Sequence, residues 1–119
     1  MSLEVQVQEV NSYLFVRAEG RYSLAGLSDL LDRVKAESGK RTHRGVILDV
    51  SRIAGTIPLL EIFGLGVQSS KVWGPSFRIA LISPEVGIFN FFENVARNRG
   101  VQIAVVPNQE AAMEWLALP

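Results

Sequence analysis

The sequence predicts a single α/β domain built on a mixed five-stranded sheet with about four helices. Residues 3–7 alternate between apolar and polar side chains, as expected of a strand with one buried face. Residues 46–50, 77–82 and 101–106 are apolar runs with a single polar residue in each, typical of parallel strands covered on both faces. Helix-start signals follow these runs, which favours strands alternating with helices.

The N-terminal part of the chain predicts a hairpin followed by a helix. A second β-rich run spans residues 13–18, and Asn11-Ser12 separates it from the first strand, which favours an antiparallel turn. Ser23 can cap a helix whose apolar residues between 24 and 34 recur at helical spacing, and Gly39 ends that helix.

The remaining helices are predicted from their first residues. Thr56 with Pro58, Ser83 with Pro84-Glu85, and Pro107-Asn108 each combine a capping side chain with a proline near the first turn. The last of these precedes a helix over residues 109–118. No repeat or linker interrupts the order β-β-α-β-α-β-α-β-α, so residues 1–119 are expected to form one domain.

The composition narrows the function classes. Twelve basic residues balance twelve acidic ones, so no net field favours nucleic acid as a partner. Cysteine is absent, which excludes disulfides and thiolate metal sites and suits a reducing compartment. No apolar run approaches the ~20 residues of a membrane span. A cytoplasmic protein is expected, with peripheral membrane contact as the alternative.

Three segments resemble the STAS superfamily, specifically its SpoIIAA-like branch. They are Ala18-Glu19-Gly20 at the end of the second strand, Asp49-Val50-Ser51-Arg52-Ile53 at the end of the third, and the closing Glu110-Ala111-Ala112-Met113-Glu114-Trp115-Leu116. The resemblance covers nearly the whole chain. It implies a SpoIIAA-like fold and a domain that binds proteins, nucleotides or small hydrophobic molecules without catalysing a reaction.

The best-known STAS domains are anti-sigma-factor antagonists that are switched by phosphorylation. Their acceptor lies in an Asp-Ser-Ser-Gly-Leu-like motif at the start of the helix after the third strand. The corresponding stretch here is Gly55-Thr56-Ile57-Pro58-Leu59-Leu60, in which the Asp-Ser pair is missing and Pro58 stands at or beside the expected serine. The SpoIIAA-like branch is also similar in architecture to CRAL-TRIO lipid carriers, which implies a hydrophobic ligand or a membrane-associated role.

The loops after the apolar strands hold the candidate polar site: Asp49, Ser51, Thr56 and Ser83. A phosphate on Thr56 or Ser51 would lie near a helix N-terminus, where the helix dipole favours negative charge. For Thr56 and Asp49 we prefer a structural role over a functional one. Thr56 is expected to cap the helix, and Asp49 is expected to accept hydrogen bonds from the amides that follow it.

Histidine and glycine positions carry weaker signals. His43 is the only histidine and stands among Lys40, Arg41 and Arg44, so we expect a solvated turn with at most weak attraction to anionic lipid. One histidine without cysteine predicts no metal site. Gly64 and Gly66 fall inside a predicted helix, where they either permit close helix packing or weaken the helix.

Apolar side chains exceed what one sheet contact needs in the second and third helices. Phe63, Trp73, Phe89 and Phe91 are the candidate ligand- or membrane-binding residues, around a site that opens near the first three. A larger buried core and a homodimer interface are the competing explanations.

The sequence therefore predicts a non-catalytic SpoIIAA-like module without a cofactor that binds a hydrophobic small molecule or membrane lipid. The alternative is a protein–protein regulatory module of the anti-sigma-factor-antagonist type, switched by phosphorylation at Thr56 or Ser51.

Overall fold

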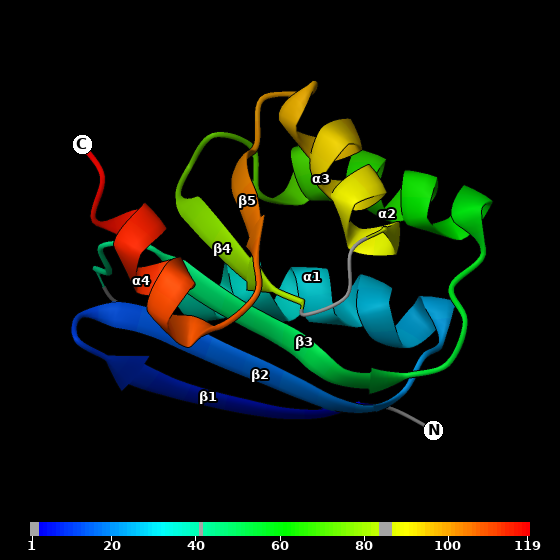
Figure 1. Cartoon of the computed structure of the whole chain (residues 1–119), viewed down its shortest axis with the longest axis horizontal. Helices are drawn as coiled ribbons and strands as arrows, with labels where there is room; N and C mark the ends of the chain where they lie inside the picture. The colour runs from blue at the N-terminus through cyan, green and yellow to red at the C-terminus, as the bar shows by residue number, and fades with distance from the viewer. Residues whose placement is uncertain (1–2, 41, 84–86) are drawn as a thin grey trace.

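A computed structural model describes residues 3–40, 42–83 and 87–119 of the chain (Figure 1). Its elements, in chain order, are β1 (Glu4–Val10), β2 (Tyr13–Arg21), α1 (Leu24–Ser38), β3 (Val46–Ala54), α2 (Leu59–Val72), β4 (Arg78–Ile82), α3 (Ile88–Arg97), β5 (Gln102–Val106) and α4 (Gln109–Leu116). This order is the one that the sequence predicts.

The five strands form one sheet in the order β1-β2-β3-β4-β5. β1 and β2 are antiparallel, and the other pairs are parallel. Asn11 and Ser12 form the predicted hairpin turn, with φ of 50° and 69°. Positive φ at both central residues gives a turn whose twist matches the twist of the strands that it joins. The predicted mixed α/β fold is confirmed.

Two apolar layers enclose the sheet. α1, α2 and α3 cover one face, where Leu31, Ile62 and Phe92 pack with side chains from β2, β3 and β4. Among the described helices, α4 alone covers part of the other face, through Ala112 and Leu116 (Figure 1). All three crossover helices lie on the same face because each joins a strand to its parallel neighbour by a connection of the same hand.

The helix ends agree with the sequence in part. Ser23 Oγ accepts the Gly26 amide at 3.0 Å, and Asn108 Oδ1 accepts the Ala111 amide at 2.8 Å, so both side chains cap their helices as predicted. Pro58 is the N-cap residue of α2 and provides no side-chain cap. The helix start predicted at Pro84-Glu85 lies outside the described residues.

β3 is longer than its apolar run. The sequence predicts a strand that ends at Val50, but β3 continues to Ala54 because β2 supplies partners for it. The register shifts between Arg17 and Glu19, after which Glu19 lies beside Arg52. Asp49 therefore lies within the strand and not at its end.

Candidate functional site

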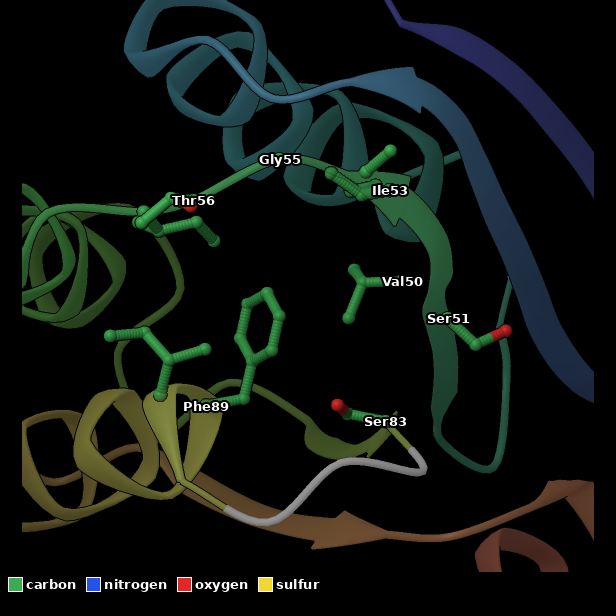
Figure 2. A pocket seen from close by; sticks show the side chains of 10 residues that line it. Val50, Ser51, Ile53, Gly55, Thr56, Ser83 and Phe89 are labelled. Carbon is green, nitrogen blue, oxygen red and sulfur yellow. The ribbon is translucent and has the colours of Figure 1, made fainter.

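A pocket of about 440 Å³ opens at the carboxyl end of the parallel strands (Figure 2). β3, the loop after it, the end of β4 and the first turn of α3 form its walls. The lining residues are Val50, Ser51, Ile53, Ala54, Gly55, Thr56, Ile57, Ser83, Ile88 and Phe89. Ligands of open α/β sheets bind at this edge.

The unequal lengths of β3 and β4 create the pocket. Asp49 beside Ile82 is the last pair between these two strands, and β3 then continues to Ala54 beside β2 alone. Gly55, at a φ of 112°, redirects the chain toward α2. A side chain is strained at this φ, so glycine suits the corner.

Asp49 is a buried carboxylate held by two neighbours. Its Oδ1 accepts the Ser51 amide at 2.9 Å and the Ser51 hydroxyl at 2.6 Å. Its Oδ2 lies 3.2 Å from Arg17 Nε. The predicted hydrogen bond to a following amide is confirmed, and Asp49 stabilises the register shift of β3. In Figure 2 the Ser51 hydroxyl points away from the pocket, so the hydroxyl is not the part of Ser51 that lines the pocket.

Thr56 does not cap α2, and the capping prediction is wrong. The residue stands two positions before the N-cap Pro58, and its side chain has no hydrogen-bond partner among the described residues. It is exposed at the rim of the pocket (Figure 2). A hydroxyl in this position is accessible to a modifying enzyme and lies near an uncapped helix N-terminus.

Ser83 and Phe89 form the opposite wall of the pocket. The Ser83 amide donates to the Val106 carbonyl at 2.9 Å, which joins the end of β4 to β5, and its hydroxyl points into the pocket in Figure 2. The Phe89 ring also points into the pocket and meets Phe92 edge-to-face at 6.5 Å. The structure thus brings together Ser51, Thr56, Ser83 and Phe89 from the predicted site.

The other predicted aromatic residues lie elsewhere. Trp73 follows the last turn of α2, but it is 1% exposed and its Nε1 donates to the Leu31 carbonyl at 2.9 Å. Phe91 is half-buried against the main core. Phe63 is 42% exposed, with the Arg99 guanidinium 5.5 Å from its ring. The expected common opening near Phe63, Trp73 and Phe89 is therefore wrong, because packing between α1 and α2 takes Trp73 into the core.

α2 and α3 are neighbours, as predicted, and they pack closely where Gly66 meets Val95. A Cβ built on Gly66 would lie 2.7 Å from Val95 Cγ1, whereas one on Gly64 would meet nothing within 4 Å. Of the two roles considered for these glycines, Gly66 therefore serves close packing.

His43 is also placed differently from the prediction. Its side chain is only 5% exposed, with Nε2 3.4 Å from Glu9 Oε1, and neither ring nitrogen has a hydrogen bond to any described residue. The Arg44 amide donates to the Ser12 carbonyl at 3.0 Å. This bond folds the loop onto the hairpin and buries the imidazole, so the solvated-turn prediction is wrong.

The apolar surplus predicted for the second helix lies partly on the surface of α2, where Phe63 was a predicted site residue and Leu59 and Leu60 were not. Leu59, Leu60 and Phe63, here called the α2 apolar patch, are 59%, 85% and 42% exposed. Next to it, the Tyr22 hydroxyl donates to Glu61 Oε1 at 2.6 Å. The absence of a polar face on this helix was the signal, but the sequence could not assign its leucines to core or surface.

Neither a metal site nor a membrane-spanning helix is found among the described residues. Over the described residues, no three His, Asp or Glu side chains gather in a way that could hold a metal ion. None of the described helices combines the length and the apolar character needed to cross a membrane.

No protein-family model and no curated protein matches this sequence. Solved structures do match its fold. An RsbS variant from Moorella thermoacetica is 14% identical with a TM-score of 0.65, over 94% of this chain and 93% of that one. An uncharacterized Shewanella loihica protein with a SpoIIAA-like fold is 14% identical with a TM-score of 0.62, over 98% and 94%.

An anti-sigma factor antagonist from Mycobacterium paratuberculosis is 15% identical with a TM-score of 0.56, over 97% of this chain and 94% of that one. SpoIIAA is also similar, in its unphosphorylated form, at 13% identity and a TM-score of 0.53 over 98% and 99%. Identities this low carry the fold and not the activity. The chain has the SpoIIAA-like fold that its sequence predicts.

Proposed function

We propose that this chain is a non-catalytic regulatory module that binds another protein through the α2 apolar patch and the loop between β3 and α2. The observation that carries the proposal is the exposure of Leu59, Leu60 and Phe63 around the first turns of one helix. Clustered apolar side chains on a protein surface commonly mark an interaction site.

Two similar structures support a partner-binding role. One is an anti-sigma factor antagonist, and SpoIIAA carries the same description. Residues 55–58 join the pocket to the patch, so a partner that covers the patch would also contact the rim at Thr56.

Regulation by phosphorylation at Thr56 is part of the proposal. SpoIIAA is known in both an unphosphorylated and a phosphorylated form. The exposed Thr56 hydroxyl suits modification better than the Ser51 hydroxyl, which is bonded to Asp49 at 2.6 Å. A phosphate on Ser51 would meet the Asp49 carboxylate and be repelled by it.

The decisive experiment changes Leu60 to Glu, which removes the most exposed apolar side chain and keeps a good helix former. The control is Leu118→Glu, since Leu118 is 55% exposed beyond the end of α4. Proteins captured from source-cell lysate by the wild-type chain and both variants are quantified by mass spectrometry, and candidates are retested as purified proteins.

We expect at least one directly binding protein whose affinity falls about 10-fold or more with Leu60→Glu and is unchanged with Leu118→Glu, as for loss of a central interface side chain. If every binding protein tolerates Leu60→Glu, the α2 apolar patch is not the docking surface.

A second candidate function is binding of a small apolar molecule or lipid. The pocket favours it because Val50, Ile57 and Phe89 give apolar walls beside the hydroxyls of Thr56 and Ser83. Mass spectrometry of a solvent extract of the purified protein tests this function. A stoichiometric apolar compound that is lost in Phe89→Ser would support it, and an empty protein would remove it.

A further inference from the structure

β1 is an edge strand whose outer side is open. It pairs with β2 without interruption from Glu4 beside Glu19 to Val10 beside Tyr13. The two-residue turn makes Val10–Tyr13 a hydrogen-bonded pair, and such pairs alternate along an antiparallel ladder. The backbone groups of Val5, Val7 and Glu9 therefore point away from β2. No described residue forms a hydrogen bond with them.

The opposite edge of the sheet is protected. β5 has only five residues, and the outward amide of Val105 donates to Glu93 Oε2 at 2.8 Å. A carboxylate against an edge amide prevents another strand from pairing there. Proteins usually protect edges with lysine, proline, bulges or such covering groups. β1 has seven residues and no lysine, proline or bulge, and its two charged side chains, Glu4 and Glu9, lie toward its ends.

The side chains of β1 suit burial by another strand. Val5 and Val7 are half-buried on the face that α1, α2 and α3 cover. Gln6 and Gln8 project from the opposite face as exposed neutral amides. Leu3 and Val5 also border a groove of about 230 Å³, whose α1 side includes Asp29 and Arg33. A neighbouring strand would cover the apolar side chains without burying a charge at the centre of β1.

We propose that β1 pairs antiparallel with β1 of a second copy of this chain, so that the two sheets become continuous. The two-fold axis passes through Val7, the midpoint of Glu4–Val10. All outward residues then pair, Val7 with Val7 and Val5 with Glu9 of the second copy.

The same register avoids charge repulsion. Gln6 faces Gln8 of the second copy and Glu4 faces Val10, so no two like charges are directly opposite. The two α1 helices lie on the same side of the joined sheet, because the axis is perpendicular to it. Any contact between these helices would repeat reciprocally, as a two-fold interface requires.

The test is the mass of the full chain in solution, measured by light scattering during size-exclusion chromatography across a concentration series. We expect twice the 13.1 kDa chain mass for the wild type. Val7→Pro removes an outward amide that β2 does not use, so this variant should be monomeric while its circular dichroism stays that of the folded chain.

A second variant avoids reliance on a proline substitution. Gln6→Lys with Gln8→Lys places lysines opposite each other across the proposed interface at exposed positions. We expect its dimer dissociation constant to rise about 10-fold or more from like-charge repulsion. Gln109→Lys, on the exposed start of α4, is the control and should leave the dimer intact.

Three outcomes would overturn the proposal. The first is a wild type that stays monomeric at about millimolar concentration, far above the range of specific dimers. The second is a dimer that survives the β1 variants. The third is a dimer that only Leu60→Glu disrupts, because this result would assign the interface to the α2 apolar patch.

Discussion

Gly66 on α2 lies so close to Val95 on α3 that a Cβ on Gly66 would be 2.7 Å from Val95 Cγ1. Two residues earlier, Gly64 has open space around it. The same helix thus contains one glycine that sets the distance between two helices and one that does not.

Gly66→Ala should therefore destabilise the protein and Gly64→Ala should stabilise it. The added methyl at position 66 must displace Val95, at a cost of about 1–3 kcal/mol for overpacking. At position 64 alanine gains about 1 kcal/mol of helix propensity over glycine. Urea unfolding of both variants checks the opposite signs, and equal effects would contradict the packing role of Gly66.

Asp49→Asn should cost about 1–3 kcal/mol of unfolding free energy, because a buried ion pair loses its charge and an amide group replaces an oxygen facing Arg17 Nε. The control is Glu19→Gln, which removes only an exposed pair with Arg52 at 3.9 Å and should change stability by less than about 0.5 kcal/mol. Urea unfolding of the two variants measures the difference. Similar losses in both would show that burial of Asp49 does not matter.

Most of the fold follows from local pattern. The alternation in β1 and the apolar runs of β3, β4 and β5 identify their strands, because the side-chain period of a strand is visible in the sequence. The extension of β3 to Ala54 cannot be recognised in the sequence, since residues 51–54 depend on partners that β2 provides. The pocket exists because of this extension, so its walls could not be predicted as a set.

The burial of individual side chains could not be predicted from the sequence either. Trp73 and His43 both stand in loop-like sequence, yet tertiary contacts bury them, the first by a hydrogen bond to Leu31 and the second by the loop that folds onto the hairpin. Leu60 shows the converse, since it belongs to an apolar helix and is 85% exposed. Helical periodicity places a residue on a face but does not say what covers that face.

Trp73→Phe should lower the unfolding free energy by about 1–3 kcal/mol, because it removes the hydrogen bond to the Leu31 carbonyl and leaves a void in the core. Trp115→Phe is the control, as Trp115 is only half-buried under the Arg78 guanidinium. Thermal unfolding followed by circular dichroism measures both. A smaller loss at position 73 than at position 115 would contradict the core role of Trp73.

The Tyr22–Glu61 hydrogen bond should make stability fall in alkali. Burial raises the pKa of Tyr22, and the bond to Glu61 and its negative charge raise it further. The folded state holds the phenol proton more tightly than the unfolded state, so this stabilisation is complete below about pH 10 and is lost as the pH rises further.

Urea unfolding at several values between about pH 8 and pH 11 measures this loss. Tyr22→Phe should remove the Tyr22 contribution to the alkaline slope and cost about 0.5–1.5 kcal/mol at neutral pH for the lost hydrogen bond. An alkaline slope that is identical in wild type and variant would mean that Tyr22 does not titrate differently on folding.

Thr56→Glu should weaken partner binding without destabilising the fold, because Thr56 is exposed, caps nothing and lies at the rim where the β3–α2 loop meets the α2 apolar patch. A negative charge at this position would be desolvated by a partner covering Leu60, and an unpaired desolvated charge is costly. Thr56→Ala should bind as the wild type does, since the hydroxyl bonds to no described residue.

Intact-mass spectrometry of protein from its source cells should find a phosphate that Thr56→Ala removes. Binding that Thr56→Glu leaves unchanged would separate Thr56 from the docking surface even if the patch itself binds.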